Sequence, residues 1–243
     1  MKEYDKGLIR KYESTVLYAD GNCKKADTYL LNEHALKISI NGRDEISFIC
    51  TKSNLRELVA GRLYTDRYIS KADDIEKIIF SDDEKTAQVT LRSDRCHQEM
   101  TEAKSVPDFS LEWIFSLTKK FEKDMPIHDI TSCTHSCILS KDEEILFSCE
   151  DIGRHNAVDK TVGYGVLTDT DLTKCILFTS GRVPVDMIQK VVNARIPVVV
   201  SKSVATKEAI DLAEKHGLKL ILKAHTDSIQ ILDENLLSYL RYD

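Results

Sequence analysis

Three short apolar runs alternate with two amphipathic segments in the second half of the chain, and this alternation constrains the fold more than any other feature. The runs cover residues 175–179, 197–201 and 218–222. Pro184 near the start of the first segment, and Thr206 and Gly217 at the two ends of the second, are typical of helix termini. Strands buried on both faces and joined by helices form parallel sheets, so the pattern predicts an α/β domain.

The first ninety residues have the pattern of mainly β structure. Asn41-Gly42 separates two apolar runs, which is a strong hairpin signal. Asn54 and Glu57 have the spacing of a capping box and predict a helix that ends near Thr65. Four strands are expected in this part, at 36–40, 46–50, 75–80 and 87–91.

Residues 92–105 are polar and aperiodic, which is typical of a surface loop. A helix is expected to open at Pro107 and to end before Pro126. We therefore expect a β-rich N-terminal part over 1–104 and an α/β domain over 105–243, with a parallel or mixed sheet and helices on both faces.

Composition excludes several classes of protein. The formal net charge of −6 does not favour nucleic acid or an anionic membrane as a partner. The longest apolar runs, such as 196–200, are far shorter than a membrane span, and residues 1–13 show no secretory signal. Seven cysteines, an odd number in a chain of this length, indicate reduced thiols and a cytoplasmic protein.

Polar and cationic residues follow two neighbouring predicted strands. Ser180, Gly181 and Arg182 come directly after one strand, and Lys202 follows the next. Open α/β sheets bind ligands at the carboxyl ends of their strands, and helix N-termini favour anions. The pattern favours a phosphate-bearing ligand, although ordinary turn chemistry would also explain it.

Residues 150–160 read EDIGRHNAVDK, a dense group of charged and polar side chains at a strand-to-helix turn. Arg154 and His155 are the candidate ligand donors of this motif. A solvated helix face would account for Asp159 and Lys160 equally well.

Cys96 is the candidate nucleophile, because Arg92, Arg95 and His97 surround it in the predicted loop and cations favour a thiolate. An exposed spectator thiol is the alternative.

Two weaker patterns concern zinc. Cys133, His135 and Cys137 alternate but lack the tight C-x-x-C spacing, so buried thiols are the preferred interpretation of the two cysteines. His97 and Glu99 fit half of a zinc deaminase signature whose P-C-x-x-C half is missing.

Two long strings, EDIGRHNAVDK at 150–160 and TSGRVPVDMIQK at 179–190, resemble the formate dehydrogenase accessory protein family, FdhD. The segment 131–135 is similar to the glycine-rich segment of that family. The resemblance implies a cytidine deaminase-like α/β fold and a homodimer. It implies a cytoplasmic sulfur carrier that accepts persulfide sulfur from a cysteine desulfurase. The sulfur would pass to the molybdenum or tungsten bis-guanine-dinucleotide cofactor and so activate the formate dehydrogenase apo-enzyme.

The chain departs from the family pattern at two places. The family loop C-G-x-C-G is replaced by a segment with the single cysteine Cys96, the expected persulfide acceptor. A family segment of the type F-x-R-G is replaced by residues 223–228, where Lys223 or His225 would supply the cation. The first departure leaves open an alternative function, a non-catalytic chaperone that binds cofactor without moving sulfur. The expected cofactor-binding residues are Arg154, His155, Ser180, Gly181, Arg182, Lys202, Lys223 and His225.

Overall fold

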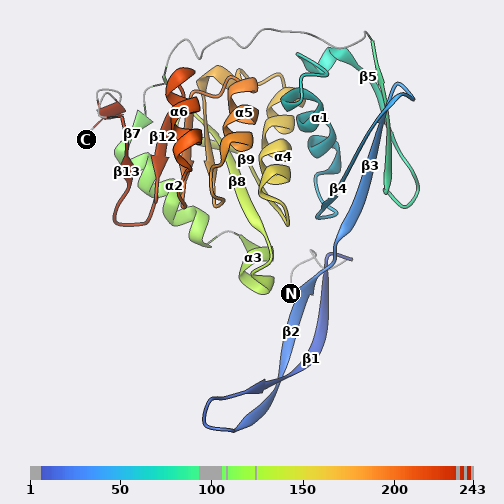
Figure 1. Cartoon of the computed structure of the whole chain (residues 1–243), viewed down its shortest axis with the longest axis vertical. Coiled ribbons are helices and arrows are strands. Elements are labelled where there is room, and N and C mark those ends of the chain that lie inside the picture. The colour runs from blue at the N-terminus through green and yellow to red at the C-terminus, as the bar shows by residue number, and fades with distance from the viewer. Residues whose placement is uncertain are drawn as a thin grey trace.

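The computed structural model describes residues 7–92, 106–107, 109–123, 125–233, 236–237 and 240–241. Its centre is a six-stranded sheet with the order β13-β12-β11-β10-β8-β9 (Figure 1). The strands are β8 (His135–Lys141), β9 (Glu144–Asp151), β10 (Cys175–Thr179), β11 (Val198–Ser201), β12 (Lys219–Leu222) and β13 (Gln230–Ile231).

The sheet is mixed. β10, β11 and β12 are parallel, whereas β8 is antiparallel to both β9 and β10, and β13 is antiparallel to β12. The prediction of an α/β sheet is confirmed, and the three apolar runs are its parallel strands.

Helices cover both faces of this sheet. Four flank it: α2 (Leu111–Lys123), α4 (Arg154–Leu167), α5 (Val185–Asn193) and α6 (Lys207–Lys215). Alternate strand residues such as Leu177 and Val199 share one core cluster with α4, α5 and α6. Their neighbours Phe178 and Val200 pack in a second cluster with α2. This alternation is the period of two that a strand buried on both faces requires.

A second sheet has the order β4-β3-β6-β5. Its strands are β3 (His34–Ile40), β4 (Asp44–Cys50), β5 (Ile75–Phe80) and β6 (Thr86–Leu91). They confirm the four strands expected in the N-terminal part. Leu36, Ile38 and Val89 belong to the same core cluster as Leu177, so this sheet and the α/β part share one hydrophobic core.

The helix α1 (Leu55–Thr65) crosses α4 closely. A Cβ atom built on Gly61 would lie 1.7 Å from the carbonyl oxygen of Asp159, and one on Gly163 would lie 1.8 Å from that of Glu57. Only glycine allows two backbones to approach in this way. The predicted capping box is wrong: Asn54 adopts a left-handed conformation and its side chain makes no capping hydrogen bond, although α1 does end at Thr65.

The hairpin of β1 (Ile9–Leu17) and β2 (Cys23–Leu31) extends away from the rest of the molecule (Figure 1). None of its strand residues is buried. The short helix α3 (Pro126–Thr131) lies beside the base of this hairpin. The sequence analysis did not predict β1 and β2, because their side chains are largely polar and charged.

The remaining elements are short. They comprise the 3-10 turns Ala72–Asp74 and Leu172–Lys174 and a parallel pair formed by β7 (Phe109–Ser110) and β14 (Leu240–Arg241). The helix expected from Pro107 therefore begins four residues later, after β7. Within the part of the chain that the structure describes, no helix has the length and apolar character needed to span a membrane.

Candidate functional site

A pocket of about 570 Å³ lies where β10 and β11 end and β8 begins. We call it the carboxyl-edge pocket. Its lining comes from the end of α2, from α3, from the segment between α3 and β8, and from the two strand ends. The lining residues are Phe121, Met125, His128, Asp129, Ser132, Cys133, Thr134, His135, Ser136, Ser180 and Lys202. The structure thus brings the predicted Ser180 and Lys202 to one cavity.

Backbone hydrogen bonds hold Ser180 and Lys202 in place. Ser180 N–H donates to the carbonyl of Ser136 (3.1 Å), and Ser180 Oγ accepts from Ser136 N–H (3.0 Å). Lys202 N–H donates to the carbonyl of Thr179 (3.0 Å). Its ammonium group lies 5.9 Å from the ring centroid of Phe121, in cation–π geometry. Because these segments continue the sheet, the pocket has a rigid wall.

Arg154 and His155 form the first turn of α4 and lie at the same edge of the sheet. A Cβ atom on Gly181 would be 3.0 Å from Arg154 Cβ, so glycine is needed for the arginine to pack against this turn. His155 Nε2 lies 2.9 Å from Asp186 Oδ2. The Arg154 Nε atom is buried and has no hydrogen-bond partner among the described residues.

His135 is the electrostatic centre of this region. Burial lowers its pKa below the ordinary value of 6.5, and the charges of Arg154, His128, Arg182 and His155 lower it further. These four neighbouring groups are cationic when charged, and Asp129 is the carboxylate that lines the pocket beside them. Its Nδ1 atom lies 3.4 Å from Ser180 Oγ. Such a concentration of positive charge favours an anion.

The acids of the 150–160 motif have structural roles. Glu150 caps α3, because its carboxylate accepts hydrogen bonds from the N–H groups of Ile127 (2.9 Å) and His128 (2.7 Å). It also accepts one from Thr134 Oγ1 at 2.8 Å. Glu150 therefore fixes α3, one wall of the carboxyl-edge pocket.

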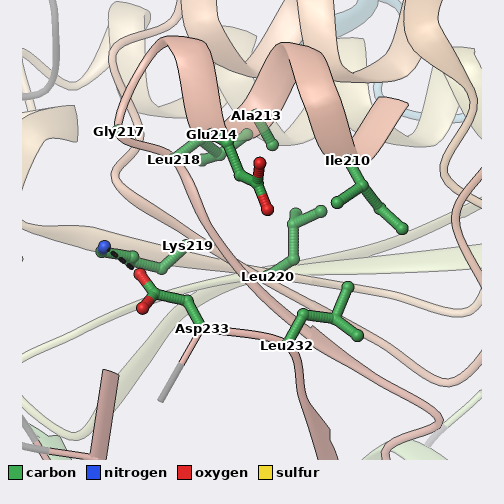
Figure 2. A pocket seen from close by; sticks show the side chains of 9 residues that line it. All are labelled: Ile210, Ala213, Glu214, Gly217, Leu218, Lys219, Leu220, Leu232 and Asp233. Carbon is green, nitrogen blue, oxygen red and sulfur yellow. Dashed lines mark hydrogen bonds and ion pairs between the residues drawn. The ribbon is translucent and has the colours of Figure 1, made fainter. Parts of the chain in front are cut away.

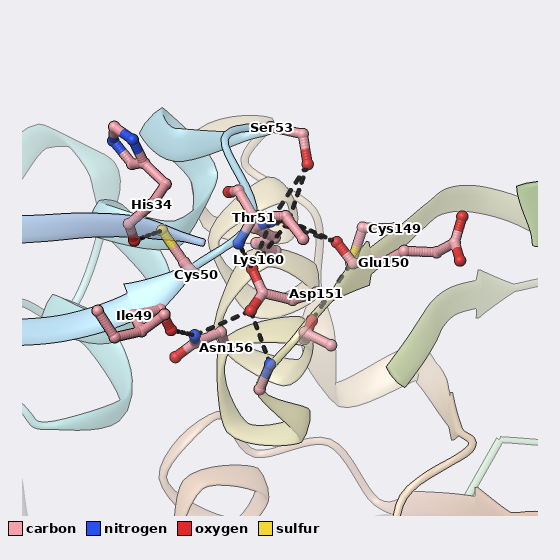
Figure 3. Close-up of polar contacts among 12 residues, drawn as sticks. His34, Ile49, Cys50, Thr51, Ser53, Cys149, Glu150, Asp151, Asn156 and Lys160 are labelled. Carbon is pink, nitrogen blue, oxygen red and sulfur yellow. Dashed lines mark hydrogen bonds and ion pairs between the residues drawn. The ribbon is translucent and has the colours of Figure 1, made fainter. Parts of the chain in front are cut away.

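Asp151 and Lys160 form a buried ion pair of 2.6 Å, with both side chains fully buried (Figure 3). Thr51 of the N-terminal part joins them: its N–H donates to Asp151 (3.0 Å), and Lys160 Nζ donates to its hydroxyl (2.7 Å). Asn156 Nδ2 donates to Asp151 Oδ1 (2.9 Å) and to the carbonyl of Ile49 (2.7 Å). The interpretation of Lys160 as a residue of a solvated helix face is wrong.

Asp159 is also buried rather than solvated. It accepts hydrogen bonds from Lys190 (2.9 Å) and from Thr65 Oγ1 (2.8 Å). Burial raises its pKa, and the Lys190 charge opposes that rise. Of the dense motif, Arg154 and His155 are thus the ionisable residues whose side chains remain outside these internal networks.

The other predicted site residues lie apart from the carboxyl-edge pocket. Lys223 and His225 are exposed after β12 and do not line it; Lys223 N–H donates to the carbonyl of Ser203 (3.0 Å). Arg182 is exposed in the turn after β10. Cys96, His97 and Glu99 lie outside the described residues.

The thiols divide into two groups. Burial raises the pKa of Cys50, Cys149 and Cys175 to about 12, and raises that of Cys137 well above its ordinary value. Cys133 is exposed and lines the carboxyl-edge pocket, so its interpretation as a buried thiol is wrong. Cys133 directly follows Ser132, which adopts a left-handed conformation at the end of α3.

His128 is a pocket residue that the sequence analysis did not name, and Cys133 was weighed there only as a zinc ligand or a buried thiol. Glu150, from the distant strand β9, caps α3 and so positions both residues. No local sequence signal marks this cap. Among the described residues, no group of three His, Cys, Asp or Glu side chains is placed to hold a metal ion. The arrangement gives no support to the zinc hypothesis for Cys133, His135 and Cys137.

A smaller pocket of about 360 Å³ lies at the opposite edge of the sheet, between α6 and the start of β12. Figure 2 shows the Lys219 and Asp233 side chains directed at one another, and they form an ion pair. Ile210, Leu220 and Leu232 supply an apolar wall. Because its lysine is already neutralised, this pocket is a poorer candidate for an anionic ligand.

The mixed sheet, the helices on both faces and the cationic pocket at the strand ends define an α/β protein with the features of an anion-binding site. The chain belongs to the FdhD/NarQ family, whose model matches residues 31–108 and 96–235.

Two relatives illustrate the sequence similarity. The chain is 31% identical over 197 residues to the Protein FdhD of Methanocaldococcus jannaschii, which covers 80% of this chain and 84% of the relative. It is 30% identical over 222 residues to the Sulfur carrier protein FdhD of Sulfolobus acidocaldarius, covering 83% and 88% respectively.

A solved structure is similar in fold. It is a protein from Desulfotalea psychrophila that is described as a formate dehydrogenase accessory protein. The TM-score is 0.83 at 24% identity, and the match covers 96% of this chain and all of the other.

Proposed function

We propose that this protein is a sulfur carrier that serves formate dehydrogenase. It accepts persulfide sulfur from a cysteine desulfurase and passes it to the molybdenum or tungsten bis-guanine-dinucleotide cofactor, which is its cargo. Relatives over most of the chain are named sulfur carrier protein FdhD, and this supports the sulfur-carrying role. The protein acts in the cytoplasm, as a homodimer, on the formate dehydrogenase apo-enzyme.

The observation that carries the proposal is the cationic edge of the sheet. His135 is surrounded by Arg154, Arg182, His128 and His155, and among the described residues Arg154 and Arg182 have no ion-pair partner. A guanine dinucleotide carries phosphate groups that would neutralise this charge. Arginine binds phosphate through two parallel hydrogen bonds, and Lys202 adds a point charge in the adjoining pocket.

Cys96 is the proposed acceptor of sulfur from the desulfurase. We also propose that the fold is the cytidine deaminase-like α/β architecture, and the mixed sheet with helices on both faces supports this. The other two predicted cofactor ligands, Lys223 and His225, would contact only a ligand that extends beyond the carboxyl-edge pocket toward β12.

Two measurements on the purified protein test this function. After incubation with a cysteine desulfurase and cysteine, the peptide that contains Cys96 should gain about 32 Da for one persulfide sulfur, and this gain should vanish in Cys96→Ala. In calorimetry, Arg182→Ala should weaken GDP binding by about 1.5–3 kcal/mol, while Arg56→Ala, an exposed arginine on α1, should leave it unchanged.

A second function is favoured by one observation, the single cysteine in the 92–105 segment. The protein would then be a chaperone that binds the cofactor without transferring sulfur. This alternative predicts GDP binding that is sensitive to Arg182→Ala, no persulfide on any cysteine, and full maturation of formate dehydrogenase by Cys96→Ala.

A further inference from the structure

Cys133 differs from the other thiols in the described part of the chain. Four of those are buried in the core. Cys23 is exposed, but it lies on the extended hairpin, whereas Cys133 lines the carboxyl-edge pocket together with His128, His135 and Lys202. A thiol, two imidazoles, an ammonium group and the Asp129 carboxylate therefore share one cavity large enough for a small ligand.

A second observation, at the turn next to the pocket, favours an anion in this region. The Arg154 Nε atom is buried without a hydrogen-bond partner among the described residues, and the Arg154 charge is the largest of the neighbouring charges that lower the pKa of His135, which lines the pocket. A buried donor left unsatisfied costs free energy, which a bound ligand would recover. Cys133 thus lies beside a place prepared for a negatively charged cargo.

We propose that Cys133 is a second sulfur-accepting thiol, which takes sulfane sulfur from a persulfide and holds it at the carboxyl-edge pocket. The inference rests on the proposed function, and it supplies the second thiol that the single cysteine of the 92–105 segment lacks.

The transfer balances without any further reactant. The Cys133 thiolate attacks the terminal sulfur of a donor persulfide, R–S–SH. A new S–S bond forms to Cys133 Sγ, the bond between the two donor sulfurs breaks, and the donor leaves as the thiolate R–S⁻. One persulfide and one thiolate stand on each side of the reaction, so no external oxidant or reductant is consumed.

The test uses the full-length, reduced protein and two sources of sulfur: a cysteine desulfurase with cysteine, and glutathione persulfide. After quenching with iodoacetamide, peptide mass mapping should find a gain of about 32 Da on the Cys133 peptide. Cys133→Ser should abolish this signal, and Cys23→Ser should not change it.

Cys96→Ala distinguishes the donors. If Cys133 is still loaded by the desulfurase, the enzyme is the donor; if only glutathione persulfide loads it, Cys96 relays the sulfur. Sulfur on Cys96 with none on Cys133 would overturn the inference and leave the proposed function intact. Sulfur on neither cysteine would overturn both.

A protection experiment tests whether Cys133 serves the ligand site. Saturating GDP should slow alkylation of Cys133 by iodoacetamide at least several-fold and leave that of Cys23 unchanged. Equal rates for Cys133 with and without GDP, in a protein shown to bind GDP, would show that its thiol does not face the bound ligand and would overturn its role in delivery.

Discussion

At the scale of single residues, burial decides which members of a charged motif are available to a ligand. The side chains of Asp151, Asn156 and Lys160 bind one another in a buried network. Arg154 and His155 lie at the edge of the sheet, outside this network. The sequence identified the motif and its two ligand candidates. It could not show that Thr51, about a hundred residues away, supplies the partner that buries Lys160.

His135 gives a prediction about pH. Its pKa is lowered by burial and by neighbouring cations, so the free protein holds it neutral at and somewhat below pH 6.5. A bound phosphate would offset those cations and raise this pKa, so binding takes up a proton. GDP affinity should therefore rise as pH falls from the pKa of His135 in the complex toward its lower pKa in the free protein, by about tenfold in total for each unit by which binding raises the pKa.

Calorimetry of GDP binding from pH 8 to pH 5 measures this effect. His135→Asn is the control, because it removes this imidazole and leaves every other titrating group, the nucleotide phosphate included, common to the two proteins. Equal pH profiles for the two proteins would contradict the assignment of this pH dependence to His135.

In the unliganded protein, His135 has the opposite effect on stability. The unfolded chain binds the proton more readily than the folded protein, so the free energy of unfolding should fall as pH drops below about 6.5.

At the scale of elements, local signals worked where they coincided with tertiary packing. The apolar runs at 75–80 and 175–179 match β5 and β10 to the residue, and Thr206 caps α6 through a hydrogen bond from Ala209 N–H (3.2 Å). Asn54 failed as a cap because the chain enters α1 in a left-handed conformation. The helix α3 depends on Glu150 from β9, so no local pattern could place it beside the pocket.

The crossing of α1 and α4 provides a stability prediction. Gly163→Ala would place a Cβ atom 1.8 Å from a backbone oxygen of α1, and the two helices must separate to accept it. We expect a loss of about 3 kcal/mol in the free energy of unfolding, measured by urea titration.

Gly165→Ala on the same helix is the matched control. Its Cβ atom would meet Leu172 Cδ2 at 2.5 Å, the end of a flexible side chain, and alanine favours the helix by about 0.5–1 kcal/mol. Its net effect should stay within about 1 kcal/mol. Equal losses for the two variants would mean that the close backbone approach is not the cause.

At the scale of the whole molecule, the β-rich N-terminal part and the α/β part are tied by shared interactions. The sequence suggested a boundary near residue 104, yet Leu36 and Leu177 belong to one core cluster. Thr51 also reaches the buried Asp151–Lys160 pair. A boundary drawn from composition cannot detect this, because the contacts join segments that are distant in sequence.

These ties predict that the two parts unfold together. Asp151→Asn should leave the fully buried Lys160 ammonium without its carboxylate and cost about 3–5 kcal/mol. The loss should lower the urea midpoint equally for the fluorescence of Trp113, on α2, and for the far-UV circular dichroism of the whole chain. Glu13→Gln, which breaks an exposed ion pair with Lys25 on the hairpin, should leave the midpoint unchanged. Two separate transitions, with only one moved by Asp151→Asn, would instead show two independent folding units, and the buried pair would then stabilise only one of them.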